Sequence, residues 1–406
     1  MAASAGETSK RGRLLSWFEK RLPIRLFIDT QLTGYFAPAN FNVWYYFGVL
    51  ALVLLVVQFA TGIFLAMFYK PDEGMAFDSV QYIMREVEWG WLIRYAHSTG
   101  ASFFFIVVYL HMFRALLYGS YKAPRELLWL FGMLLYVTLM AEAFFGYVLP
   151  WGNMSYWGAQ VIVNLFSTIP LIGDALAEWI RGDYVIADAT LNRFFALHVV
   201  LIPMALLLLV MLHLVALRTS GSNNPDGVEK GPKESVPYHP YYTVADVVAV
   251  AVFLVVFAIV VFFAPAFGGL FLEDANFEPA NPLSTPEHIA PAWYFTPYYA
   301  ILRAVPDQRL GALLMLLAVT SFLFLPWLDR SPVRSMRYKG WVSRIALASF
   351  AISFIALGYL GLQPAEGAYV VRARVLTIMY FAYFWLMPVY SRASLDRGWH
   401  APVSSA

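Results

Sequence analysis

Eight long apolar stretches constrain this chain more than any other feature. They cover residues 42–68, 91–118, 127–148, 192–217, 244–264, 310–328, 342–361 and 374–390. Each is long enough to cross the roughly 30 Å hydrocarbon core of a bilayer as a helix, and a helix satisfies its own backbone hydrogen bonds in lipid. Only 13% of the residues are charged, against about 25% in soluble domains. We therefore predict an all-α integral membrane protein with eight transmembrane helices in the lipid bilayer.

The charges between these stretches predict the orientation. Lysine and arginine gather in residues 1–40 and after the second and sixth stretches, whereas the connections 150–190 and 265–308 are mostly acidic. Because cytoplasmic connections carry the excess of Lys and Arg, we expect both termini to be cytoplasmic. Residues 1–40 also have apolar side chains spaced as in an amphipathic helix on the membrane surface: Leu14, Leu15, Trp17, Phe18 and Leu22.

The longest polar connection divides the chain in two. Residues 219–243 form a predicted cytoplasmic linker between a four-stretch half over 41–218 and a second four-stretch half over 244–406. The sequence contains no cysteine, which excludes disulfides, Cys-ligated iron–sulfur clusters and haem attached through a CxxCH motif. The formal net charge of +2 gives no indication of nucleic-acid binding.

Four histidines form two pairs within the first half. His97 and His111 lie 14 residues apart in the second stretch, and His198 and His213 lie 15 apart in the fourth. At about 100° and 1.5 Å per residue, each pair shows roughly one helix face at two levels about 21 Å apart. Two such helices side by side would oppose the histidines at both levels, which suits a metal held between imidazoles in a flat macrocycle. Alternatively, a single transmembrane histidine can be a hydrogen-bonding residue of the bundle interior.

Arginines and glycines accompany these histidines. Three arginines lie within five residues of a histidine: Arg94, Arg114 and Arg193. Guanidinium groups near the membrane surfaces suit haem propionates, although arginines also occur at membrane edges without a ligand. Four glycines of the first and third stretches repeat the 14-residue interval: Gly48, Gly62, Gly132 and Gly146. They would leave room for a porphyrin edge, although small residues also serve close helix packing.

Several segments resemble cytochrome b of the bacterial respiratory cytochrome bc complex, the quinol:cytochrome c oxidoreductase or complex III. They are GWLIRYAHSTGAS, GYVLPWGNMSYWGAQVIVNLFSTIPLIG, RFFALHVV, GSNNPDG, PYHPYYTVAD and HIAPAWYFTPYYAILRAVP. The resemblance implies that the first four helices form a bundle enclosing two non-covalent b haems. It also implies that His97 and His198 ligate the iron of the outer, low-potential haem, and that His111 and His213 ligate that of the inner, high-potential haem.

The resemblance further implies the activity and its partners. Quinol would be oxidised at an outer site and quinone reduced at an inner one, with electrons crossing the membrane between the two sites. Proton release at the outer site and proton uptake at the inner site would contribute to the proton gradient. Because the chain has no cysteine, separate Rieske iron–sulfur and c-type cytochrome subunits are implied. The family also implies a homodimeric complex in the bacterial inner membrane. Two alternatives from the residues alone are a di-haem anchor of a dehydrogenase and a transporter whose His and Glu side chains relay protons.

The sequence departs from the family pattern in three places. The 15-residue interval between His198 and His213 is one longer than in mitochondrial relatives, and Pro203 could bend the helix and absorb the extra residue. The outer-site tetrapeptide, usually Pro-Glu-Trp-Tyr, reads Pro291-Ala292-Trp293-Tyr294. Arg218 replaces the histidine expected before SGSNNP.

These departures shape the predictions for the two quinone sites. At the inner site we expect Arg218, Ser222 and Asp246, with Asp246 or water delivering protons because an arginine does not titrate. At the outer site we expect Glu142 to replace the missing carboxylate as proton acceptor, since an ionisable group at membrane depth is a functional candidate. We expect Tyr147 and Tyr294 to shape that pocket. The alternative is that Glu142 is a structural residue paired with a neighbouring hydroxyl.

Overall fold

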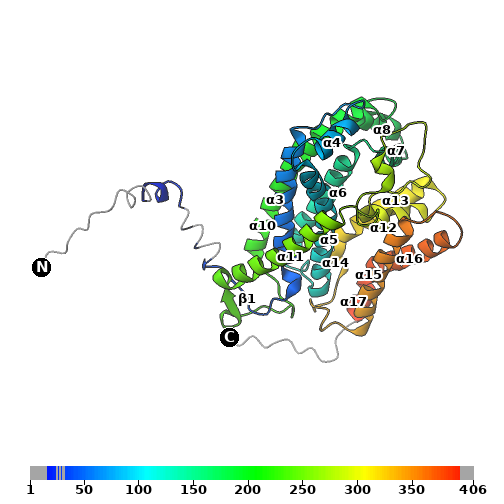
Figure 1. Ribbon diagram of the computed structural model, residues 1–406. Coiled ribbons are helices and arrows are strands. Elements are labelled where there is room, and N and C mark those ends of the chain that lie inside the picture. The colour runs from blue at the N-terminus through cyan, green and yellow to red at the C-terminus, as the bar shows by residue number, and fades with distance from the viewer. Residues whose placement is uncertain (1–15, 24–25, 27–28, 30–32, 394–406) are drawn as a thin grey trace.

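The computed structural model describes residues 16–23, 26, 29 and 33–393, and within them the chain is mainly helical (Figure 1). Of the predicted surface helix, Leu14 and Leu15 lie outside the described residues, whereas Trp17, Phe18 and Leu22 are described and exposed. Four of the six basic residues in the predicted N-terminal arm, Lys10, Arg11, Arg13 and Arg25, and both chain termini also lie outside the described part.

Seven helical segments of the described chain are long and apolar enough to cross a membrane. Their main helices are α3 (Phe47–Ala66), α5 (Gly90–Tyr118), α6 (Glu126–Val148), α10 (Ile202–Ser220), α11 (Thr243–Phe263), α13 (Gln308–Thr320) and α15 (Trp341–Gly361). The predicted eighth stretch forms α16 (Gly367–Trp385), which carries Arg372 and Arg374, followed by α17 (Met387–Ala393). The Nε of Arg374, an exposed residue, donates to the backbone carbonyl of Ala304 at 2.7 Å.

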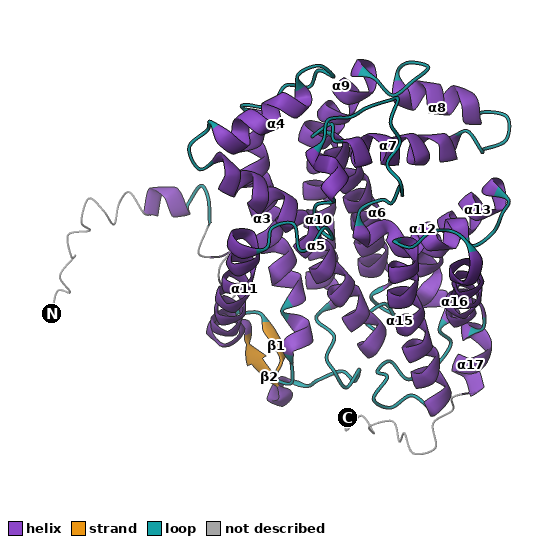
Figure 2. Ribbon diagram, turned by 45° about the vertical axis from the view of Figure 1, so that its right-hand side comes forward, coloured by secondary structure: helices purple, strands orange, loops and turns teal. Residues whose placement is uncertain are grey.

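Several shorter elements lie at the two ends of the bundle (Figure 2). At one end lie α4 (Ala76–Arg85), α7 (Asn153–Phe166), α8 (Gly173–Arg181) and α9 (Asp188–Ala196). At the opposite end β1 (Phe36–Pro38) pairs antiparallel with β2 (Ser235–Pro237). Short helical turns are η2 (Val43–Tyr45), η3 (Leu197–Leu201), η4 (Pro232–Glu234), η5 (Tyr238–Tyr242), η6 (Asp274–Phe277), η7 (Trp293–Phe295) and η8 (Ser321–Phe324), with α12 (Thr296–Arg303) and α14 (Leu325–Leu328) between the longer helices.

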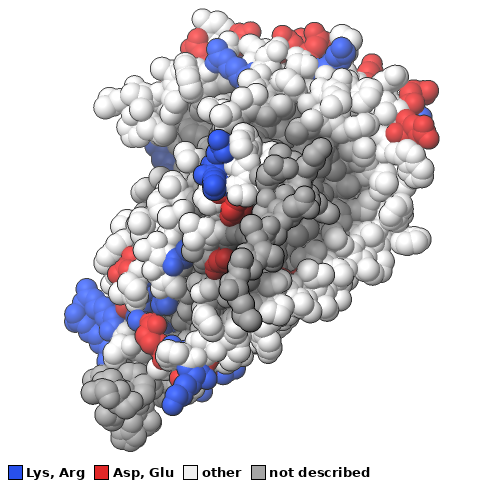
Figure 3. All heavy atoms as spheres, turned by 90° about the vertical axis from the view of Figure 1, so that its left-hand side faces the viewer, with Lys and Arg blue, Asp and Glu red and all other residues white. Residues whose placement is uncertain are grey.

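We call the end with α4, α7 and α8 the outer end, following the orientation predicted from the connections. On the face shown in Figure 3, acidic side chains gather along this end, and the largest group of basic side chains lies toward the opposite end. The polar connection 219–243 is held at the inner end by ion pairs, for example between Arg334 and Glu229 at 2.6 Å and between Arg337 and Asp226 at 3.1 Å. Asn223 of the GSNNPDG motif is buried and donates to the carbonyl of Tyr118 at 2.8 Å.

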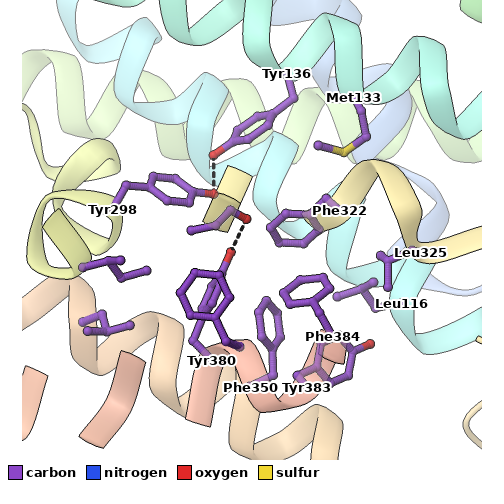
Figure 4. Close-up of a cluster of buried hydrophobic side chains, with 14 of the residues drawn as sticks. Leu116, Met133, Tyr136, Tyr298, Phe322, Leu325, Phe350, Tyr380, Tyr383 and Phe384 are labelled. Atoms are coloured by element: carbon purple, nitrogen blue, oxygen red, sulfur yellow. Dashed lines mark hydrogen bonds between the residues drawn. The ribbon is translucent and has the colours of Figure 1, made fainter. Parts of the chain in front are cut away.

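One apolar cluster joins the two halves of the chain. Its buried side chains come from α5 and α6 and from the elements between η7 and α17. Tyr136 of α6 is hydrogen-bonded to Tyr298 of α12 at 2.8 Å, and Tyr380 of α16 donates to the carbonyl of Ala318 at 2.8 Å (Figure 4). In the first half, α3 packs along α5 and α6 along α10. This arrangement fixes the faces of α5, η3 and α10 that carry the four histidines.

A buried carboxylate ties the inner connections together. The Asp329 side chain lies 3.1 Å from Lys122 Nζ and 2.5 Å from Lys339 Nζ, and it accepts from the Tyr121 hydroxyl at 2.6 Å. Burial favours the neutral acid, but the two ammonium groups outweigh it and hold the pKa of Asp329 below its usual value. The carboxylate is therefore ionised at neutral pH and compensates two nearby cations.

We expect Asp329→Asn to lower the free energy of unfolding by about 3–5 kcal/mol, because removing one member of a buried ionic cluster leaves the others uncompensated. The measure is thermal unfolding in detergent at neutral pH. Because the folded pKa of Asp329 is depressed, this contribution is present above the unfolded pKa and disappears as the pH falls through the folded pKa. The difference between wild type and variant should shrink accordingly. Glu234→Gln, at an exposed ion pair with Lys230, is the control and should change little.

Candidate functional site

The two predicted histidine pairs face each other across the bundle. His97 of α5 lies opposite His198 of η3, with ring centroids 6.2 Å apart. His111 of α5 lies opposite His213 of α10, with centroids 6.4 Å apart. A metal bound at about 2.0 Å to one nitrogen of each ring would place opposed centroids roughly 6 Å apart. Both pairs therefore have the spacing of two axial ligands on one metal.

Each glycine of the 14-residue pattern faces one imidazole. An added Cβ would come within 3.1 Å of the His97 ring at Gly62, within 3.4 Å of His111 at Gly48, and within 3.3 Å of His213 at Gly132. At Gly146 it would overlap the His198 ring. The glycines thus let α3 and α6 approach the four imidazole rings. The sequence predicted contact between the glycines and a porphyrin edge, whereas the structure shows contact with the histidine rings themselves.

Polar groups orient three of the four imidazoles. Thr61 Oγ1 lies 2.9 Å from His97 Nδ1, and Arg114 Nη2 lies 3.4 Å from His111 Nδ1. His198 Nδ1 lies 3.0 Å from the backbone carbonyl oxygen of Glu142 and 3.1 Å from its carboxylate. A partner on one ring nitrogen directs the other nitrogen toward a metal. Glu142 therefore stands where it can orient His198.

The three predicted arginines differ in their surroundings. Arg94 and Arg114 are partly buried, and each keeps a buried guanidinium nitrogen without a hydrogen-bond partner among the described residues. Such a nitrogen fits an anionic group such as a haem propionate. Arg193 donates instead to the carbonyl of Trp179. Its role toward a propionate stays a prediction.

A π-helical turn absorbs the extra residue between His198 and His213. This turn, η3, covers Leu197–Leu201 and lies directly before α10, whose second residue is Pro203. A π turn adds one residue to an α-helix without breaking it, and a proline removes a backbone donor from the following turn. The helix distortion that the sequence predicted at Pro203 is thus located just before it, in the π turn that contains His198.

The predicted outer pocket is built around the Pro-Ala-Trp-Tyr segment. Tyr294 is buried and stacks on Phe105 with ring centroids 3.9 Å apart, and its carbonyl accepts from the Tyr109 hydroxyl at 2.6 Å. The Trp293 indole donates to Ser102 Oγ at 3.0 Å. Pro291 and Ala292 are buried beside them. Position 292 therefore presents only a methyl group.

The LPWG turn after α6 holds the loop that carries Glu273 and Asn276. Trp151 adopts a left-handed backbone conformation with φ 55°, and its carbonyl accepts from the Ala280 N–H at 2.9 Å. The Asn153 N–H donates to the carbonyl of Glu278 at 3.0 Å. An added Cβ at Gly152 would lie 2.6 Å from the Asn276 side-chain oxygen. Glycine is needed here because the loop lies against the backbone.

This loop brings Glu273 to the predicted pocket. Asn276 donates both to Glu273 Oε2 and to the Tyr147 hydroxyl, each at 3.0 Å, and Tyr147 is also hydrogen-bonded to Glu273. Burial raises the pKa of Glu273 to about 7. Burial and the negative charge of Glu273 also raise the pKa of Tyr294. A carboxyl group and two tyrosines thus interact at the outer end.

The three predicted inner-site residues meet through two tyrosines. The guanidinium of Arg218 lies over the Tyr35 ring, 4.0 Å from its centroid, and 5.7 Å from that of Tyr238. The Tyr35 hydroxyl lies 2.8 Å from Ser222 Oγ, and the Tyr238 hydroxyl donates to Asp246 Oδ2 at 2.6 Å. Tyr35 directly precedes β1, and Tyr238 directly follows β2. The antiparallel pairing of β1 and β2 brings the two tyrosines together. Arg218 keeps a buried nitrogen without a described partner.

Comparisons with known proteins agree with this geometry. Residues 32–221 match the family model described as cytochrome b/b6/petB, and residues 279–381 match that of the cytochrome b C-terminal part, b6/petD. The chain is 58% identical to a cytochrome b of Allochromatium vinosum over 94% of this chain and 96% of the relative. The chain belongs to the cytochrome b family.

Two further family relatives extend the match. A cytochrome b/c1 of Bradyrhizobium diazoefficiens is 46% identical over 97% of this chain and 57% of the relative. A solved chain titled hyperthermophilic respiratory complex III aligns with TM-score 0.88 and 38% identity, covering 94% of this chain and 99% of the other. Family membership implies b-type haem and respiratory electron transport. The histidine pairs, the facing glycines and the unpartnered arginine nitrogens fit such a haem.

Sequence reasoning missed several polar residues of the cytochrome b sites. Glu273 and Asn276 lie in the connection 265–308, where the sequence indicated acidic charge and the tetrapeptide but no role for these two residues, and Tyr35 and Tyr238 lie in polar segments outside the apolar stretches. A signal for Glu273 does exist, since it follows the apolar run GLFL. Both Asn276 and Tyr35 contact residues that are far away in the sequence. Asn276 lies 129 positions from its partner Tyr147, and Tyr35 lies 187 positions from its partner Ser222.

Proposed function

We propose that this chain is the cytochrome b subunit of a bacterial complex III that oxidises quinol at the outer end and reduces quinone at the inner end. The observation that carries the proposal is the pair of imidazole–imidazole spacings, 6.2 and 6.4 Å, at two levels of α5. His97 with His198, and His111 with His213, would each hold one haem iron, and an iron held by two histidines would supply electron transfer rather than oxygen chemistry. When bound, two b haems would carry single electrons between the two quinone sites.

We place the protein in the bacterial inner membrane with both termini cytoplasmic and α16 as the eighth transmembrane helix. The separation of acidic and basic connections supports this orientation. The partners are a Rieske iron–sulfur subunit and a c-type cytochrome, in a homodimeric complex. The cytochrome b/c1 of Bradyrhizobium, which is longer than this chain and carries both cytochromes in its name, supports the c-type partner. The absence of cysteine requires that the iron–sulfur cluster belong to another chain.

The chain's own residues have distinct roles in this scheme. Arg94 and Arg114 would bind the haem propionates, and Glu142 and Thr61 would orient His198 and His97. Tyr147, Pro291, Trp293 and Tyr294 line the outer quinol pocket. At the inner site, Arg218 stabilises negative charge on quinone while Asp246 and Tyr238 supply protons. The assignment of Glu142 as acceptor of a quinol proton stays a prediction.

The proposal is tested on the purified complex with a quinol as reductant and cytochrome c as acceptor. We expect reduction of cytochrome c and of two b-type components in a redox titration of the absorption spectrum. A chain without b-type absorption would be a transporter-like protein. A chain with b-type haem that transfers no electrons from quinol to cytochrome c would fit the dehydrogenase anchor instead.

Asp246→Asn should slow reoxidation of the inner haem by quinone at least about tenfold, because asparagine can still accept the hydrogen bond from the Tyr238 hydroxyl but cannot take up and release a proton. Reduction of the same haem through the outer site should keep its rate, as followed by stopped-flow absorption. Glu229→Gln removes a carboxylate at the same end whose side chain is 72% exposed, and is the control. Equal reoxidation rates in the Asp246 variant and the wild type would remove Asp246 from the proton path.

A further inference from the structure

The outer pocket needs a proton acceptor that its tetrapeptide does not provide. Quinol loses two protons when it is oxidised, and a positioned carboxylate is a suitable acceptor for one of them. Ala292 is buried and 6% exposed, so no ionisable group occupies this position. The acceptor must therefore come from another element around the pocket.

Glu273 has the required contacts. Asn276 fixes both Glu273 Oε2 and the Tyr147 hydroxyl through its side-chain nitrogen, at 3.0 Å each. The Asn276 side-chain oxygen is held in turn by the Ser155 N–H at 2.8 Å. Tyr147 accepts from Asn276 and donates to Glu273, which leaves a lone pair on its oxygen for a further donor. A quinol hydroxyl in the pocket is such a donor.

The electrostatic surroundings suit a carboxyl group that gains and loses a proton near neutral pH. The titratable groups that interact with Glu273 are Tyr147 of α6 and Tyr294 of η7, and no described cation compensates its charge. Burial raises the pKa of Glu273 to about 7. A general base works best when its pKa lies near the operating pH. The next residue, Asp274, is exposed to solvent at the outer end. A proton released from Glu273 therefore has a short path to the water at this end.

We propose that Glu273, acting through the Tyr147 hydroxyl, accepts one of the two protons that quinol loses at the outer site; this inference rests on the proposed function. One quinol O–H bond breaks as its proton passes to the Tyr147 oxygen, and the original Tyr147 proton forms a new O–H bond on the Glu273 carboxylate. Tyr147 ends as it began, and Glu273 ends as a neutral acid. The electron lost with this proton goes to the iron–sulfur partner, the one-electron oxidant of the proposed function.

Glu142 is placed for a different task. Its carboxylate lies 3.1 Å from Nδ1 of His198, and its backbone carbonyl lies 3.0 Å from the same atom. Glu273 contacts none of the four histidines in the described structure. The two carboxylates can therefore be separated by experiment, since changes at Glu142 act first on the His198 ring and changes at Glu273 act on the pocket.

The test compares Glu273→Gln, Glu273→Asp and the exposed control Asp274→Asn in the intact complex. We expect Glu273→Gln to lower kcat for quinol oxidation at least about tenfold with KM nearly unchanged. Because only the ionised carboxylate accepts a proton, the wild-type rate should rise as the pH passes upward through about 7, and this rise should disappear in Glu273→Gln. Glu273→Asp should keep the rise with a lower kcat, and Asp274→Asn should match the wild type.

Two further readouts separate this inference from the proposed function. The b-haem spectrum and the reduction of the inner haem through the inner site should be the same in Glu273→Gln as in the wild type. Wild-type kcat and pH profile in Glu273→Gln would overturn the inference and leave the proposed function intact. Loss of the pH-dependent rise in Glu142→Gln but not in Glu273→Gln would assign the proton to Glu142 and would also overturn it. A wild-type complex that does not oxidise quinol would refute the proposed function itself.

Discussion

Loss of one b-haem component and of electron transfer across the membrane is expected when His198 is replaced by alanine. An iron with one remaining axial histidine loses the low-spin coordination of a paired site, and His97 lies opposite His198 with no other described imidazole at that level. His111→Ala should remove the other component, because its partner is His213. The measurement is the redox-difference spectrum of the purified complex together with quinol:cytochrome c turnover, which should be abolished in both variants.

His239 supplies the matched control. It is exposed, lies 2.9 Å from Thr243 Oγ1 and belongs to neither pair. His239→Ala should keep both haem components and the wild-type turnover. Two unchanged low-spin components in His198→Ala would show that the ligand assignment is wrong.

The four facing glycines predict a graded series of alanine variants. An alanine in a helix gains up to about 1 kcal/mol over glycine, whereas overpacking costs about 1–3 kcal/mol. At Gly146 the new methyl group would overlap the His198 ring, so Gly146→Ala should lose the outer haem and a large part of the stability. The gaps of 3.1, 3.3 and 3.4 Å at Gly62, Gly132 and Gly48 predict progressively smaller effects in that order. Replacing Gly132 with a larger residue such as valine should weaken haem packing more than alanine does.

Haem content per chain and the thermal unfolding temperature measure this series. Gly231→Ala is the control, because an added Cβ there meets no atom within 4 Å. An effect at Gly48 as large as that at Gly146 would mean that contact with the imidazoles does not set the order.

Patterns local in sequence predicted much of this molecule. The apolar stretches located the membrane helices because lipid imposes length and composition on each one separately. The intervals of 14 residues, and of 15 between His198 and His213, located the histidines and glycines on common faces because helical geometry is regular. The last stretch was harder, since α16 carries Arg372 and Arg374 and its composition alone does not mark it as a membrane span. The Arg374–Ala304 hydrogen bond explains how one of these charges is accommodated.

Contacts between distant segments could not be predicted in the same way. The π turn at Leu197–Leu201 depends on how α10 packs beside α6, and only its approximate place was indicated by Pro203. Glu273 joins Tyr147 because the loop is fixed to the LPWG turn by backbone hydrogen bonds. Glu142 was recognised as an unusual acid at membrane depth, but its contact with His198 required the neighbouring helix.

The distribution of contacts along the chain also sets an order in which its parts become complete during synthesis. Both imidazole pairs and their facing glycines lie before residue 214, so they can form from the first four membrane helices alone. The inner cluster is complete only after Asp246 has been synthesised, long after Tyr35. The outer group that includes Tyr147 is complete only after Tyr294 has been synthesised. Domains that emerge first can fold first. A nascent chain would thus complete both histidine pairs before the proposed quinone sites are complete.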